Sequence, residues 1–196
     1  MSAAATDFPA LQPDDWPELV RNWEELDVPP GYRAEIIDGK SITLTPPPSL
    51  DHAAIASLLH RQLVKRLPEE YETFQNIGVA ASGQKRVYIP DLVVALRDQV
   101  CGPERRIEAD EAELIVEITS PSNANHDRIN KAAVYAAGGV PLYLLVDALG
   151  AAGPMVTLFG SPVSGVYRTL ASVKFGEPVL VPDPLGLELD TSSFPS

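Results

Sequence analysis

The sequence contains a single cysteine, Cys101, among its 196 residues. One cysteine forms no internal disulfide and supplies no cluster of thiolate metal ligands. Hydrophobic runs are short, and none approaches the ~20 apolar residues that a membrane-spanning helix needs. The first residues also lack the basic region followed by an apolar stretch that marks a secretory signal. We therefore expect a cytoplasmic protein without membrane association.

Positive charge is also scarce, because 15 Lys and Arg stand against 27 Asp and Glu, for a net charge of −12. Proteins that bind nucleic acids usually present a basic face that neutralises phosphates. The acidic total counts against such a partner, but it leaves room for a local basic patch. Arg61, Lys65 and Arg66 on one predicted helix, and Lys85 with Arg86 at a predicted turn, are either such patches or solvated positions.

Several motifs of well-known enzyme classes are missing. The sequence has no glycine-rich phosphate-binding loop, no zinc-type spacing of Cys and His, and no serine-nucleophile motif. Its 45% hydrophobic content is sufficient for one substantial core. We expect an N-terminal arm over residues 1–28 and one domain over residues 29–196, ending in a proline-rich tail that wraps the surface.

The first half of the chain predicts helices and short strands. Residues 16–26 favour a short helix, and Asp38-Gly39 lies between two strand-like runs as in a two-residue hairpin turn. Ser49 can cap a helix over residues 50–67, in which apolar residues recur at helical spacing. Further strands are predicted at residues 71–82 and 86–97, joined around Ser82-Gly83, and a charged loop at 98–111.

The second half predicts a strand–helix–strand unit. Residues 113–120 and 141–148 are almost continuously apolar, which is typical of strands buried on both faces. The helix between them is capped by Asn123 or Asn125, carries Ile129, Ala132, Ala133 and Ala136 on one side, and ends at Gly138-Gly139. Such a crossover makes its two strands parallel. With an edge hairpin over residues 155–173, turning at Gly-Ser-Pro, the pattern indicates an α/β fold with a mixed central sheet.

Two of these apolar runs each contain one carboxylate, Asp91 and Glu117. An ionised carboxylate in an apolar run is costly unless it is paired or bound to a metal. Pro90 cannot donate a ladder hydrogen bond, so Asp91 is expected at an edge, a bulge or a break in its strand. Two carboxylates on neighbouring strands would bind Mg²⁺ or Mn²⁺ and activate a water. The alternative for Asp91 is an acid at a strand turn that faces water.

The helix after Glu117 carries Asp127, Lys131 and Tyr135 at four-residue steps, so the three share a face. Lys131 could reach back over the end of the strand, orient the attacking water and stabilise charge on the phosphate. Asp127 would hold Lys131 or contact a water, whereas the simpler interpretation is an ordinary surface ion pair. Glu35 either completes the metal shell or faces outward from its strand. His52 could contact a phosphate, act as a local base or merely cap its helix.

In order and spacing, these residues resemble the Uma-two family of endonucleases, within the restriction-endonuclease-like PD-(D/E)xK superfamily. The matching pieces are YRAEIIDGKSITLTPPPSLDHAAI, VYIPDLVVAL, ELIVEITSPSNANHDRINKAAVYAAGGVPLYLLVDA and PLGLELD. The resemblance implies a restriction-endonuclease-like sheet flanked by helices and a site made from Glu35, Asp91, Glu117 and Lys131. The superfamily pattern would place its lysine at position 119, where this sequence has Thr119, so Lys131 is the candidate.

Three functions remain open at this point. The first is a Mg²⁺-dependent or Mn²⁺-dependent endonuclease that acts on DNA, as the resemblance implies. The second is a catalytically inactive nucleic-acid-binding module of the same fold, favoured by the acidic total and by Thr119. The third is a metal-dependent hydrolase of a smaller phosphoester, which needs no basic groove. Since nuclease folds of this kind often pair to cut two strands, a homodimer is also expected.

Overall fold

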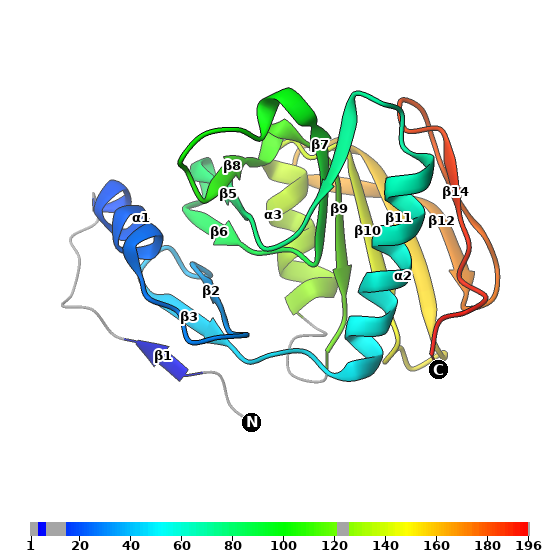
Figure 1. The fold of residues 1–196 in the computed structure, drawn as a ribbon, viewed down its shortest axis with the longest axis horizontal. Helices are drawn as coiled ribbons and strands as arrows, with labels where there is room; N and C mark the ends of the chain where they lie inside the picture. Colours follow the sequence, from blue (N-terminus) through cyan, green and yellow to red (C-terminus); the bar gives the residue numbers. More distant parts are fainter. Residues whose placement is uncertain (1–3, 7–14, 121–125, 196) are drawn as a thin grey trace.

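A central sheet of six strands organises the fold in this computed structural model (Figure 1). The structure describes residues 4–6, 15–120 and 126–195, and no side chains of residues 4–6, 126 or 127. The strand order is β12-β11-β10-β9-β7-β4; β9 and β10 are parallel and the other neighbours antiparallel. The predicted α/β fold with a mixed sheet is therefore confirmed. Its strands are β4 (Tyr71–Phe74), β7 (Leu92–Leu96), β9 (Ala112–Ile118), β10 (Leu142–Asp147), β11 (Met155–Val163) and β12 (Val166–Lys174).

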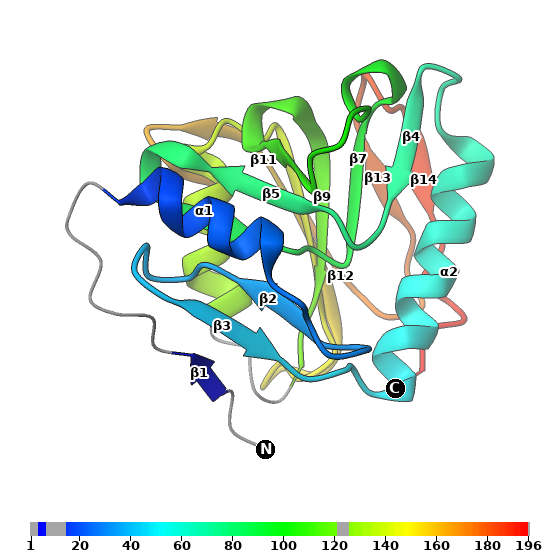
Figure 2. The same ribbon diagram turned by 60° about the vertical axis from the view of Figure 1, so that its left-hand side comes forward.

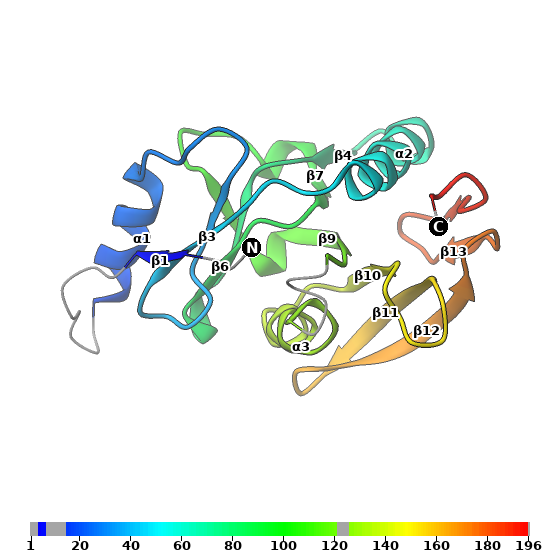
Figure 3. The same ribbon diagram turned by 90° about the horizontal axis from the view of Figure 1, so that it is seen from below.

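Two helices, α2 (Leu50–Arg66) and α3 (Ala132–Ala137), cover opposite faces of this sheet (Figure 3). Leu114 and Val116 of β9 pack in the core cluster on the α2 side, whereas Ile115 packs with Tyr135 of α3. The prediction of a strand buried on both faces is thus confirmed. Each such fully buried aliphatic side chain stabilises the fold by about 1.5–3 kcal/mol.

Two small sheets of three strands lie beside the central one (Figure 2). Helix α1 (Trp16–Glu25) buries Leu19, Val20 and Trp23 in a cluster with residues of these sheets. The indole Nε1 of Trp23 donates a hydrogen bond of 2.6 Å to the carbonyl of Ala34, which ties α1 to β2. The sheets are β1-β3-β2 and β6-β5-β8, with strands β1 (Ala4–Thr6), β2 (Arg33–Glu35), β3 (Ile42–Thr45), β5 (Gly78–Ala81), β6 (Arg86–Tyr88) and β8 (Arg106–Glu108).

The two long strands predicted at residues 71–82 and 86–97 are each divided in two. Asn76, at a φ of 59°, interrupts the first, and Pro90-Asp91 interrupts the second. The two halves of each predicted strand belong to different sheets. The predicted break at Pro90 is therefore confirmed, whereas the prediction of one continuous strand in each range was wrong. The turn η1 (Ser82–Gln84) joins β5 to β6, as predicted, and the expected loop at 98–111 contains β8 between the turns η2 (Arg97–Gln99) and η3 (Ala109–Glu111).

Both predicted hairpins exist, but their turns differ from the prediction. Strands β2 and β3 pair antiparallel across residues 36–41, where the carboxylate of Asp38 accepts hydrogen bonds from the backbone of Lys40 and Ser41. Strands β11 and β12 turn at Ser164 and Gly165, both with positive φ, rather than at Gly-Ser-Pro. The Gly-Ser-Pro segment lies inside β11, where it produces an irregularity in the register.

The tail and the crossover helix also depart from expectation. Strands β13 (Val179–Val181) and β14 (Leu187–Leu189) pair and bury apolar residues in the core cluster that includes α2, so the tail completes the core rather than only wrapping the surface. The π-helical turn η4 (His126–Lys131) precedes α3, which shifts the helical phase. Ile129 and Ala133 are therefore exposed, against the prediction, and the helix ends before Gly138 as predicted.

The predicted cap residues Asn123 and Asn125 lie outside the described residues. None of the helices in the described ranges combines the length and apolar character that crossing a bilayer requires.

Candidate active site

The topology brings Asp91 and Glu117 together where the start of β7 lies beside the end of β9 in the central sheet. Asp91 directly precedes β7 and Glu117 is near the end of β9, and these strands run antiparallel. Leu92 pairs with Val116, so the next step of the same register places Asp91 opposite Glu117. Opposed residues of an antiparallel pair share a face, with Cβ atoms about 4.5–5.5 Å apart. The fold therefore makes neighbours of two acids that are distant in the sequence.

The Asp91 carboxylate is almost fully buried and accepts several hydrogen bonds. Oδ1 lies 2.7 Å from Nη1 of Arg33 and 2.8 Å from Nε2 of His52, and Oδ2 accepts the backbone N–H of Ile118 at 2.8 Å. Burial alone would raise the pKa of this carboxyl, but the hydrogen bond from His52 and the charge of Arg33 outweigh it, so the pKa is lowered. Asp91 is accordingly an ionised carboxylate at neutral pH.

His52 reaches Asp91 from the first turn of α2. Ser49 caps this helix, because its hydroxyl accepts the backbone N–H of His52, as the sequence predicted. The ring buries its Nδ1 atom without a hydrogen-bond partner in the described structure, while Nε2 faces Asp91. The histidine is thus held in place by one bond to the carboxylate.

Glu117 lies at the centre of a second set of contacts. Its Oε1 accepts hydrogen bonds from Nζ of Lys131 at 2.9 Å and from the hydroxyl of Tyr135 at 2.7 Å. Burial, followed by the charge of Glu117, raises the pKa of Tyr135 well above its usual value, so this hydroxyl stays protonated and donates. The helix therefore delivers Lys131 and Tyr135 to the carboxylate from adjacent turns.

Lys131 also connects the third acid to the site. Its Nζ is 3.5 Å from Oε1 of Glu35, which in turn accepts the backbone N–H of Ile89 at 2.9 Å. The ammonium lies 5.3 Å from the ring centre of Tyr88, within the range of a cation–π contact. Burial raises the pKa of Tyr88 to about 12.

These groups surround a cleft of about 150 Å³. It is lined by five of the sequence-predicted site residues, together with Arg33: Glu35, His52, Asp91, Glu117 and Lys131. Tyr135 contacts Glu117 from behind the cleft, and the side chain of Asp127 lies outside the described residues. The sequence reasoning missed Arg33. A signal was available, because Arg33 precedes Glu35 by two residues and such residues share a face of a strand.

Thr119, at the position where the sequence comparison expected a lysine, is not among the residues that line the cleft and contacts Asp147 instead. Its hydroxyl donates to Oδ1 of Asp147 at 3.1 Å, while Arg128 donates to both oxygens of Asp147 at 2.7 Å. Partial burial would raise the pKa of Asp147, but the bonds from Arg128, Leu149 and Thr119 lower it. This network joins the ends of β9 and β10 to the turn that carries Lys131.

The carboxylates that line the cleft offer the oxygen ligands that a hard divalent cation prefers. Within the described parts of the chain, no three His, Cys, Asp or Glu side chains are grouped as a ready metal site. Mg²⁺, however, is commonly bound by one or two carboxylates and retains several waters. Asp91 and Glu117, which line the same cleft, satisfy that smaller requirement.

Comparisons with known proteins identify the family and a similar fold. The Uma2 family model, described as "Putative restriction endonuclease", matches residues 16–192. The fold is similar to a crystal structure of "a putative nuclease belonging to DUF820" from Anabaena variabilis, with a TM-score of 0.67 and 18% identity over 87% of this chain and 94% of that chain.

A second solved structure, the cAAA-bound form of NucC from P. aeruginosa, has a TM-score of 0.37 and 12% identity over 80% of this chain and 79% of that chain, which is too weak to carry an argument. No curated protein gives a significant match. The family match spans most of the chain and includes every residue of the cleft described above. The chain therefore belongs to the Uma2 family of restriction-endonuclease-like proteins.

Proposed function

We propose that the protein is a divalent-metal-dependent endonuclease that hydrolyses DNA phosphodiester bonds. The observation that carries this proposal is the arrangement of Asp91, Glu117 and Lys131 around one cleft in a chain of a nuclease family. Two carboxylates and an ammonium in one small cleft are suited to a phosphodiester, which brings negative charge and needs an activated water.

Asp91 and Glu117 would hold Mg²⁺ or Mn²⁺, which prefer oxygen ligands. When bound there, the ion would supply positive charge for activating a water and polarising the phosphate. Lys131 donates toward the same region and stabilises the charge that develops on the phosphate oxygens. Glu35 holds the lysine from its second side at 3.5 Å, so we assign it a supporting role as well as that of a candidate ligand.

Arg33 and His52 fix the orientation of the Asp91 carboxylate. Arg33 is the more accessible of the two, with 26% of its side chain exposed. Since it lines the cleft, its guanidinium is also available to a phosphate oxygen, for which it offers planar, bidentate geometry. The ion pair therefore orients the carboxylate of Asp91 for the metal ion and the guanidinium of Arg33 for the substrate phosphate.

A plasmid-nicking assay tests the proposal. The protein should convert supercoiled plasmid to the nicked form with Mg²⁺ or Mn²⁺ and lose this activity in EDTA. Asp91→Asn and Glu117→Gln should each reduce the rate by about 100-fold or more, as removing a charge that stabilises the transition state does. Glu113→Gln is the matched control, because Glu113 lies on the same strand β9 outside the cleft. Equal rates in all three variants would refute the proposal.

A second candidate is a nucleic-acid-binding module without activity. It is favoured by one observation, that Asp91, Glu117 and Glu35 are all engaged by protein donors. Binding of DNA without nicking under any divalent metal would support it.

Turnover of bis-nitrophenyl phosphate without nicking would instead support a hydrolase of smaller phosphoesters. The expected homodimer is tested by light scattering of the purified protein.

A further inference from the structure

A second, larger hollow adjoins the catalytic cleft. Its volume is about 500 Å³, which lies in the range of pockets that bind small organic ligands, whereas the cleft of about 150 Å³ does not. The two cavities share Arg33 and Pro48 in their walls. Arg33 contacts Asp91 at 2.7 Å. Only the side chain of Arg33 would therefore separate a ligand in the larger hollow from Asp91, one of the proposed metal ligands.

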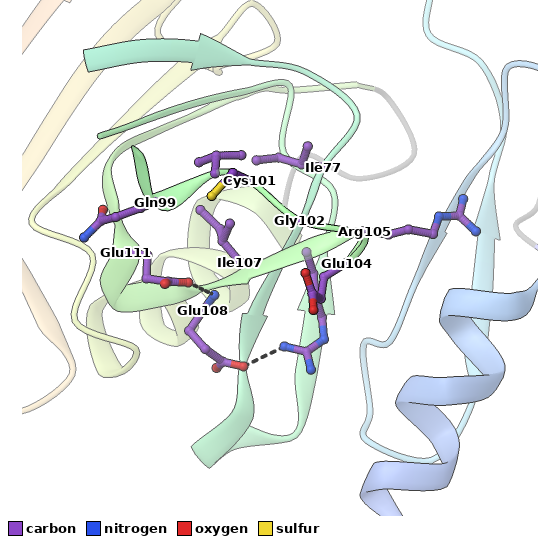
Figure 4. Close-up of a pocket in the computed structure, with 11 residues that line it drawn as sticks. Ile77, Gln99, Cys101, Gly102, Glu104, Arg105, Ile107, Glu108 and Glu111 are labelled. Carbon is purple, nitrogen blue, oxygen red and sulfur yellow. Dashed lines mark hydrogen bonds and ion pairs between the residues drawn. The ribbon is translucent and has the colours of Figure 1, made fainter. Parts of the chain in front are cut away.

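The charge of this hollow is opposite to that of the whole protein. Its described lining contains Arg33 and Arg105 and no Asp or Glu, although acids outnumber bases by 27 to 15 in the sequence. A separate hollow of about 270 Å³, drawn in Figure 4, shares Arg105 with the larger one but is also lined by Arg106 and by three acids, Glu104, Glu108 and Glu111. The larger hollow is therefore suited to an anionic ligand and the one in Figure 4 is not.

Most residues of the remaining wall are apolar, Asn76 is polar, and the wall includes the aromatic ring of Tyr32. Pro29 to Tyr32 form a turn in which the N–H of Tyr32 donates to the carbonyl of Pro29 at 3.0 Å and Gly31 adopts a φ of 83°. Proline followed by a glycine of positive φ is typical of a type II turn, which holds its shape. A side chain on Gly31 would also meet Pro47 at 3.0 Å. The turn leaves Tyr32 43% exposed beside the hollow.

Arg105 lies on the other side of the hollow and is held toward it. In Figure 4 its side chain points away from the glutamate-lined hollow and toward the segments drawn in blue. Its Nη1 donates to the carbonyls of Glu24 and Leu26, and its guanidinium carbon lies 5.9 Å from the ring centre of Trp23. Both carbonyl bonds use Nη1 alone, and an arginine has five N–H donors. The side chain is thus positioned in advance for a phosphate.

We propose that this hollow binds an unpaired nucleotide of the substrate strand next to the scissile phosphate, with its base against Tyr32 and its phosphate at Arg105. A flat aromatic base can stack on the ring of Tyr32 and against the prolines, and the negatively charged phosphate matches the arginines. A base within a duplex is stacked and paired, so it cannot enter a hollow of this kind without leaving the helix. The substrate class is therefore single-stranded or locally unpaired nucleic acid. This inference deepens the proposed function and rests on it for the location of the scissile phosphate.

Fluorescence anisotropy in EDTA tests the inference without requiring cleavage. The probes are a short oligothymidylate, an abasic backbone of the same length and a blunt duplex. We expect the protein to bind the oligothymidylate most tightly. Tyr32→Ala should weaken that binding by about 5- to 100-fold, the range of one base-stacking contact, and leave binding of the abasic backbone unchanged. Tyr32→Phe should retain the affinity, because stacking does not need the hydroxyl.

Arg105→Gln should weaken binding of both single strands and reduce the slope of log affinity against log salt by about 0.7, the value for one phosphate contact. Arg97→Gln is the control, because this exposed arginine pairs with Glu72 away from the hollow.

Equal affinity of Tyr32→Ala and the unmodified protein for oligothymidylate, or tighter binding of the duplex, would overturn the inference. If plasmid is still nicked in that case, the proposed function survives; if nothing is nicked but Tyr32 governs binding, only the nuclease proposal fails.

Discussion

The ammonium of Lys131 lies 2.9 Å from the carboxylate of Glu117, and both side chains are almost fully buried. The two residues belong to different elements, a helix and the central strand β9, which the crossover connection brings together. Burying each charge alone would be costly, and the pair is tolerated because each neutralises the other. The ion pair therefore contributes to the stability of the fold as well as to the candidate site.

Lys131→Met should lower the free energy of unfolding by about 3–5 kcal/mol, because it leaves the buried Glu117 without its cation. Adding Glu117→Gln should restore part of this loss, since the uncompensated charge is then removed. Urea unfolding at neutral pH measures both effects. Losses that simply add in the double variant would show that the two groups do not interact as the distance implies.

Tyr135→Phe should lower the free energy of unfolding by about 1–2 kcal/mol. The substitution keeps the ring contacts with Tyr88 and Tyr143 but removes the hydroxyl that donates to Glu117 at 2.7 Å. Tyr71→Phe is the control, because the hydroxyl of Tyr71 has no hydrogen bond in the described structure. A Tyr135→Phe variant as stable as the Tyr71→Phe variant would contradict this account of the contact.

Asp147→Asn should destabilise the protein by about 1–2 kcal/mol at neutral pH and much less in acid. The folded protein lowers the pKa of Asp147, so its stabilising contribution is present above the unfolded pKa of about 3.9 and is lost as the pH falls through the lower folded value. The difference in unfolding free energy between the two proteins should be constant from pH 7 to 5 and shrink below pH 4. A difference that grew in acid would have the wrong sign.

The fold was predictable where pattern and burial coincide. The apolar runs that became β9 and β10, the capped helix α2 and the crossover between the strands all follow from local periodicity and length. The sequence did not reveal that residues 71–82 and 86–97 each serve two sheets, because this depends on Asn76 adopting a positive φ and on which partner strand each half meets. The π-helical turn before α3 likewise changed which of its residues face outward.

The candidate site was predictable as a set of residues but not as a network. Single carboxylates within apolar runs indicated Asp91 and Glu117, and helical spacing placed Lys131 and Tyr135 on one face. The spacing of Arg33 and Glu35 could have placed Arg33 near the site, but its contact with Asp91, 58 residues later, could not be predicted because it depends on how distant strands meet. The structure also indicates why an acid needs no metal to be buried here, as protein donors already compensate Asp91.

The central claim, that Asp91 and Glu117 together bind a divalent cation, is tested most directly by calorimetric titration of the protein with Mn²⁺. We predict saturable binding that weakens at least about tenfold in Asp91→Asn and in Glu117→Gln and is unchanged in Glu113→Gln, because one of two carboxylate ligands is lost in each of the first two variants. Absence of binding to the unmodified protein, or equal binding by all four proteins, would contradict the claim.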